Sequence, residues 1–256
     1  MITRNGEISR AKPKPAIRWA IAPMKMATST TMRSPVVTRS HYAGAMVSPV
    51  TALSTADWRH RVFALYEEVR HAGKELPPER AHGLWAAGRD KLFATHPASP
   101  LPDDARGRFR GLRTARYDPA FRFEAVIEDT GAGETMQVPT GTDGTVPYTR
   151  LGTVTLDGLG SLAVWNLDSY GGGIFIPLRD AGSGTDGGSY GGGRYLLDTI
   201  KGAHLGAGAA PGSLVLDFNY LYNPSCAYDE AWACPLPGSA NTLAADLPVG
   251  ELYARY

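Results

Sequence analysis

The side chains best suited to chemistry gather in the strand-like segment 213–220 and the turn after it. Alternation makes one face of this segment apolar and puts Asp217 and Asn219 on the other, with Asn223 following in the turn. In one interpretation the polar face meets water, and both side chains are hydrogen-bonding groups of a turn. In the other it lines an interior, where the charge of Asp217 needs a partner. Arg194 is the partner we expect, because a guanidinium can satisfy a carboxylate with two parallel bonds.

Further polar groups are expected around that pair: Arg179, Asp180, Tyr190, Tyr195 and Glu251. We therefore predict a site for a small polar or anionic ligand, bound through Arg194, Tyr190, Asn219 and Asn223. An enzyme would use Asp217 or Glu251 as general acid or base, with Arg194 stabilising negative charge, although no reaction class is indicated. No cofactor is implied. The same cluster can equally be a structural lock.

Two motifs in the glycine-rich loop resemble known functional sites. The spacing G-x-G-x-x-G begins at Gly182 but is followed by glycines and not by a helix, so no aligned amides await a pyrophosphate. Residues 187–191 fit the nucleophile elbow of serine hydrolases around Ser189. After Ser189 the chain has one histidine, His204, and it precedes Asp217, so the usual order of the triad fails. A flexible glycine-rich hairpin is the preferred interpretation.

The two cysteines, Cys226 and Cys234, are separated by seven residues. A disulfide between them would close a short loop and contribute about 2.5 kcal/mol in the chain-entropy model. Because no export signal is evident, reduced thiols are expected. Zinc is the weaker alternative, since it would need two further soft ligands and no histidine follows Cys226.

A helical hairpin precedes these motifs. Apolar residues at helical spacing predict a first helix capped by Ser54 or Thr55 and ending near Gly73, and a second that opens after Pro77 and ends before Pro97. His96, at the end of the second helix, is expected to cap or pack rather than to catalyse. The predicted buried positions are Trp58, Val62, Leu65, Tyr66 and Val69 in the first helix, and Ala81, Trp85, Leu92 and Phe93 in the second.

Beyond the hairpin the period becomes two, which is typical of strands. The expected strands are 121–127, 134–138, 150–156, 161–167, 173–178, 194–197 and 213–220. Glycine-bearing turns separate the earlier ones, so antiparallel pairing between sequential neighbours is expected. The predicted fold is mostly β (α+β): an antiparallel barrel-like or sandwich domain preceded by the helical hairpin.

Charge divides the chain unevenly. The first 46 residues hold eight basic side chains and one acid, Glu7, which gives them a net charge of +7. The whole chain has a net charge of +1, so the remaining residues carry −6. An acidic core argues against nucleic-acid binding, although a basic arm could touch RNA or DNA. No membrane association is expected, because no apolar run approaches the length of a membrane-spanning helix.

Composition suggests three regions. Residues 1–51 are expected to be a disordered basic tail or a mis-assigned start, residues 52–96 the hairpin packed on the core, and residues 97–256 the β domain. The short apolar run at 19–22 is too small for the centre of a secretory signal, so a cytoplasmic location is expected.

Several unusual segments resemble a known family. They include His96-Pro97-Ala98-Ser99-Pro100-Leu101, Tyr117-Asp118-Pro119-Ala120-Phe121-Arg122-Phe123, Tyr190-Gly191-Gly192-Gly193-Arg194-Tyr195-Leu196, Leu216-Asp217-Phe218-Asn219, Tyr222-Asn223-Pro224-Ser225-Cys226-Ala227-Tyr228 and Cys234-Pro235-Leu236-Pro237. With Asn241, Leu243 and Gly250-Glu251 they make the chain similar to the uncharacterised domain of unknown function 1684. The resemblance implies a shared fold and no reaction. In the family, the loop after the pair Arg179-Asp180 usually carries a lysine. Residues 182–186 of this chain contain none, so any ligand contact from that lysine is absent.

A different class of function stays open beside ligand binding. The hairpin could dock a partner protein through Trp58, Trp85 and neighbouring apolar residues, and a homo-oligomer is compatible with the sequence. In that case the chain would be a structural or interaction module without catalytic activity.

Overall fold

The computed structural model describes residues 48–140, 144–232 and 234–256. The predicted tail, residues 1–51, therefore lies outside the described residues except for positions 48–51. Those positions already belong to the first helix, α1 (Pro49–Glu75), whose N-cap Ser48 accepts a hydrogen bond from the Thr51 N–H at 3.1 Å. The predicted cap at Ser54 or Thr55 is wrong, because Ser48 followed by Pro49 supplies an earlier start.

Helix α1 and helix α2 (Pro78–Thr95) form the predicted antiparallel hairpin. One face of α1 is buried through Val62, Leu65, Tyr66 and Val69, as its spacing indicates, whereas Trp58 is half-buried. Trp85 of α2 is fully buried, and its indole N–H donates to the hydroxyl of Tyr66 at 3.1 Å. The two helices therefore share an aromatic core.

The second helix ends as predicted, at His96. Its backbone N–H donates to the Leu92 carbonyl at 3.0 Å, and its buried ring stacks edge-on against Trp58, with 5.3 Å between the centroids. Nε2 lies 3.0 Å from the Asp57 carboxylate. His96 thus caps and packs, as expected. A short helix, α3 (Asp103–Arg106), follows.

Five strands form one antiparallel sheet in sequential order: β2 (Thr135–Thr140), β3 (Gly144–Leu156), β4 (Gly160–Leu167), β5 (Ile174–Leu178) and β6 (Arg194–Asp198). Each of these strands pairs with the next one along the chain, which confirms the predicted sequential pairing for this sheet. The pairing of β3 with β4 shifts register between Arg150 and Gly152.

The other sheet joins segments distant in sequence. Strand β1 (Arg122–Val126) pairs antiparallel with β7 (Ser213–Asp217), placing Arg122 opposite Asp217. The expectation of sequential pairing is therefore wrong for β1. The predicted strand 213–220 is also too long, because it stops at Asp217, and Phe218–Tyr220 forms a 3₁₀ turn.

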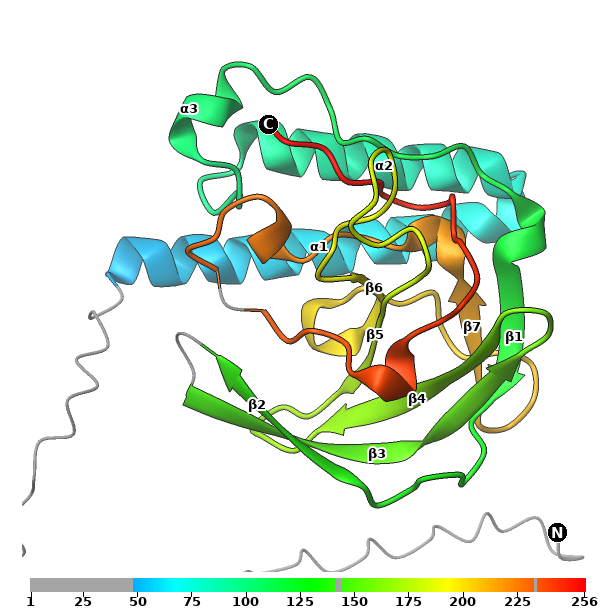
Figure 1. Ribbon diagram of the computed structural model, residues 1–256. Coiled ribbons are helices and arrows are strands. Elements are labelled where there is room, and N and C mark those ends of the chain that lie inside the picture. The colour runs from blue at the N-terminus through cyan, green and yellow to red at the C-terminus, as the bar shows by residue number, and fades with distance from the viewer. Residues whose placement is uncertain (1–47, 141–143, 233) are drawn as a thin grey trace, which may run out of the picture. The chain divides into compact units, whose positions relative to one another are not determined.

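Two large apolar clusters hold these layers together. One lies between the helices and the sheet and includes Tyr66, Trp85 and Trp165, and the other is enclosed by strands of both sheets and includes Val154, Ile176 and Phe218. Figure 1 shows α1 and α2 running side by side, with β2, β3 and β4 curving across the opposite side of the domain. The fold is α+β, a helical hairpin followed by antiparallel sheets. No helix among the described residues is both long and apolar enough to cross a membrane.

Candidate ligand-binding pocket

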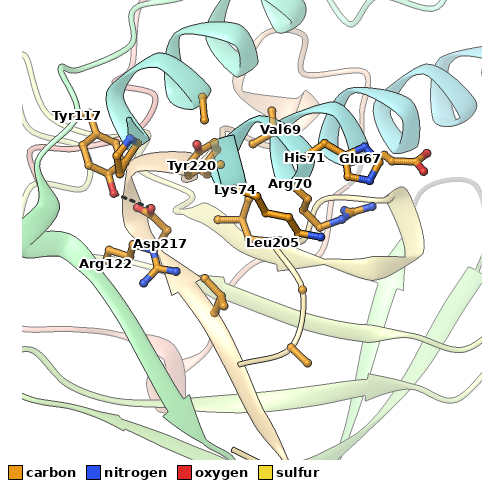
Figure 2. A pocket seen from close by; sticks show the side chains of 16 residues that line it. Glu67, Val69, Arg70, His71, Lys74, Tyr117, Arg122, Leu205, Asp217 and Tyr220 are labelled. Carbon is orange, nitrogen blue, oxygen red and sulfur yellow. Dashed lines mark hydrogen bonds between the residues drawn. The ribbon is translucent and has the colours of Figure 1, made fainter. Parts of the chain in front are cut away.

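A pocket of about 530 Å³ opens between the C-terminal half of α1, the start of α2, the loop 205–207 and the β1–β7 pair. Its volume falls in the range of small-molecule sites. Figure 2 shows Tyr117, Arg122 and Asp217 gathered on one side and Arg70, His71 and Glu67 on the other. We call it the α1–β7 pocket. Its polar lining residues are Glu67, Arg70, His71, Lys74, Tyr117, Arg122, Asp217 and Tyr220.

Asp217 reaches the pocket because it ends strand β7. Alternation turns Leu216 into the apolar core and leaves Val215 and Asp217 to line the pocket. The chain then bends into the 3₁₀ turn, where the carboxylate accepts hydrogen bonds from the backbone N–H of Asn219 at 3.1 Å and from its side-chain amide at 2.8 Å. Asp217 is only 4% exposed. It therefore combines the two interpretations of the sequence, as a turn hydrogen-bonder that faces a hollow instead of open water.

Burial governs the protonation of this carboxyl group. It raises the pKa of Asp217, although hydrogen bonds from Asn219 and Tyr117 and the charge of Arg122 oppose the change. The Tyr117 hydroxyl donates to Oδ2 at 3.1 Å. Burial, followed by the neighbouring Asp217, raises the pKa of Tyr117 as well. Tyr117 therefore keeps its proton and serves as a hydrogen-bond donor to the Asp217 carboxyl group at the pocket wall.

Three cations line the same pocket: Arg70 and Lys74 of α1, and Arg122 of β1. Arg70 and Lys74 stand four positions apart, so they lie on one face of the helix. None of the three forms an ion pair within 4 Å with a residue of the described ranges, although Arg70 donates to the His204 carbonyl at 2.9 Å. Positive charge is thus available to a bound molecule.

Aromatic groups support the inner wall. Tyr220 is buried and packs edge-on against Trp85 and against His82. His82 is also buried, and its Nε2 lies 2.9 Å from the Asn219 carbonyl. Burial lowers the pKa of His82, which favours the neutral ring. Its contact with the backbone of Asn219 holds the turn that carries Asp217.

The predicted partner of Asp217 is wrong. Arg194 pairs with Asp180, with Nη2 and Oδ2 2.6 Å apart, and also donates to the carbonyl oxygens of Leu247 and Val249. Arg194 does not line the α1–β7 pocket. Strand β6 points this side chain toward the C-terminal segment, whose carbonyl groups accept hydrogen bonds from the guanidinium. No sequence pattern reveals these contacts.

Glu251 belongs to another buried network, away from the pocket. Its carboxylate pairs with Arg89 of α2 and accepts from the backbone N–H of Asn223 at 2.9 Å and the hydroxyl of Tyr228 at 3.0 Å. Arg89 in turn contacts the faces of three aromatic rings, of which Tyr222 is closest at 4.9 Å. These groups satisfy one another, as a structural lock does.

The remaining predicted ligands are dispersed. Tyr190 donates to the Cys226 carbonyl at 3.3 Å and Tyr195 to the Pro235 carbonyl at 2.7 Å. Arg179 is exposed. Asn219 does not line the pocket, but it donates to Asp217, which does, and it also bonds the backbone of Asp118. The structure thus separates the predicted cluster into several groups and leaves Asp217, with Asn219 behind it, at the hollow.

Two alternatives from the sequence can now be compared with the structure. Ser189 is buried and donates to both oxygens of Asp180, which suits a loop anchor more than a nucleophile. Docking through Trp85 is wrong, because its side chain has no exposed surface.

Within the described ranges, no group of three or more His, Cys, Asp or Glu side chains could hold a metal ion.

Sequence reasoning missed Arg70, Lys74, Tyr117 and Tyr220 as pocket residues. One signal was present: Tyr117 and Arg122 both lie in a segment that carries the family resemblance, and Arg122 stands on the charged side of its strand. The spacing of Arg70 and Lys74 shows a basic helix face, but not what that face meets.

The comparisons with known proteins identify the family through one family model and assign no activity. A family model described as "Protein of unknown function (DUF1684)" matches residues 107–252, which confirms the resemblance. The solution NMR structure of an uncharacterised protein of Haloarcula marismortui is 32% identical, covering 65% of this chain and 89% of that one, with a TM-score of 0.46. No curated protein matches the chain.

Proposed function

This chain belongs to the DUF1684 family of proteins of unknown function, and we propose that it binds a small anionic molecule in the α1–β7 pocket. The observation that carries the proposal is the set of three cations, Arg70, Lys74 and Arg122, around a hollow of about 530 Å³. A carboxylate or phosphate group would supply the ion-pair partner that none of the three has within 4 Å among the described residues.

Charge balance supports an anion over a cation. The pocket's acids are Glu67 and Asp217, so its three cations outnumber the acids even when both acids are ionised. The apolar wall made by Val69, Val215 and Leu205 would receive a hydrocarbon portion.

The test titrates the full chain with inorganic phosphate and with a series of small mono- and dicarboxylates. Binding is measured by thermal shift and by calorimetry. Lys74→Ala and Arg122→Ala are expected to weaken the tightest interaction at least about tenfold each, a loss of about 1.4 kcal/mol. Lys91→Ala, an exposed change on α2, is the matched control. Equal weakening by Lys91→Ala, or no effect of either pocket variant, would contradict the proposal.

A catalytic version rests on Asp217. A buried carboxyl group with a raised pKa, beside a tyrosine and facing a pocket, is suited to general acid or base work. We favour it over Glu251, whose oxygens are engaged by Arg89, Asn223 and Tyr228. For any substrate found by turnover screening, Asp217→Asn should abolish the reaction while leaving binding within a few-fold. The cytoplasmic location and the homo-oligomer stay predictions from the sequence.

A further inference from the structure

The fold brings the two cysteines together, and neither of them lines the α1–β7 pocket. The backbone N–H of Cys226 donates to the sulfur of Cys234 at 3.4 Å, and both residues are free and half-buried. We propose that they are a redox site in which Cys234 attacks a hydroperoxide and Cys226 resolves the product to a disulfide.

Two tyrosine hydroxyl groups hold the backbone at or next to each cysteine. The Tyr190 hydroxyl donates to the Cys226 carbonyl at 3.3 Å. On the other side the Tyr195 hydroxyl donates to the carbonyl of Pro235, next to Cys234, at 2.7 Å. Tyr195 itself is buried in strand β6. Each cysteine is thus fixed from the domain side, so joining the sulfurs requires little loss of chain freedom.

The surroundings give the two sulfurs different roles. Hydrogen bonds from the Cys226 thiol and from the backbone N–H groups of Cys226 and Ser225, together with the charge of Lys201, lower the pKa of Cys234 against the effect of burial. Donating to Cys234 raises the pKa of Cys226. Since the thiolate is the nucleophile, Cys234 is the attacking residue and Cys226 the resolving one.

The proposed oxidation takes place in two steps. The Cys234 thiolate attacks one oxygen of ROOH, the O–O bond breaks, and RO⁻ leaves and takes a proton to give ROH. The resulting sulfenic acid is attacked by the sulfur of Cys226, the S–O bond breaks, and water departs with the Cys226 proton. Two thiols are oxidised by two electrons in all, and the peroxide is reduced.

The test treats the reduced full chain with one equivalent of hydrogen peroxide and follows intact mass and free thiols. The wild type should lose two hydrogens and keep its monomer mass on a non-reducing gel. Cys226→Ser, whose hydroxyl preserves a donor to Cys234, should gain one oxygen that dimedone captures. Cys234→Ser should react about tenfold more slowly than Cys226→Ser.

Other outcomes would overturn the inference. They are a wild type that keeps both thiols, one that forms only intermolecular disulfides, and a Cys234→Ser variant that oxidises as fast as Cys226→Ser. Peptide mapping of the oxidised wild type, which needs no variant, must find the 226–234 crosslink.

Discussion

The guanidinium of Arg194 and the carboxylate of Asp180 form an ion pair sealed from solvent, with 2.6 Å between Nη2 and Oδ2 and side chains 0% and 1% exposed. Asp180 also accepts from Ser189, while Arg194 donates to carbonyl groups near the C-terminus. The pair therefore fastens the glycine-rich loop to strand β6 and to the last part of the chain.

Breaking that pair should be costly. Arg194→Met leaves the charge of Asp180 buried without its partner, which typically costs about 3–5 kcal/mol. Chemical denaturation of the full chain measures the loss. Arg108→Met, which removes an exposed ion pair with Asp104, is the matched control and should change stability by less than about 1 kcal/mol. Similar losses in both variants would refute the assignment of Arg194 as a structural lock.

Two glycines of α2 should respond oppositely to alanine. A Cβ at Gly83 would meet nothing within 4 Å, so Gly83→Ala should stabilise the protein by about 0.5–1 kcal/mol through helix propensity. At Gly88 the same Cβ would lie 2.4 Å from a methyl carbon of Leu65, in the packed interface with α1. Gly88→Ala should therefore destabilise by about 1–3 kcal/mol. Thermal unfolding of both variants is the measurement, and a stabilised Gly88→Ala would show that the helices pack less closely.

Asp217 should make stability depend on pH. Its pKa is raised in the folded protein, so folding binds a proton, and the stability it contributes at low pH is lost as pH rises from the unfolded pKa through the folded one. Asp217→Asn removes this loss. The stability of the variant relative to that of the wild type should therefore increase as pH rises through that window. Denaturation curves taken at several pH values measure this change.

The matched control for that series is Asp157→Asn, in the exposed turn between β3 and β4. If the stability of Asp217→Asn relative to that of the wild type stays constant or falls with rising pH, the Asp217 carboxyl does not resist ionisation in the folded state.

Local patterns predicted most elements because each depends on neighbours in the chain. The buried face of α1, the end of α2 at His96 and the sequential hairpins of β2 to β6 follow from spacing, prolines and glycines. The pairing of β1 with β7 was missed, since no local signal reports the partner of a strand 90 positions away.

The site was predicted only in part for the same reason. Asp217 was identified from alternation, but Tyr117 and Arg122 come from a second segment and Lys74 from a third. Charge complementarity suggested Arg194, whereas the structure gives Arg194 to Asp180. Residue type alone cannot tell which of several acids will pair with Arg194, because the fold decides which acid lies near it.

The register that puts Arg122 opposite Asp217 also sets when the pocket can exist. During synthesis the helices and the first strands emerge well before residue 213, so a growing chain carries the basic helix face with no opposing wall. Closing so long a loop is slow compared with forming a hairpin. A chain that ends before residue 213 therefore lacks the β7 wall of the pocket, and any ligand recognition there would require the completed β1–β7 pair.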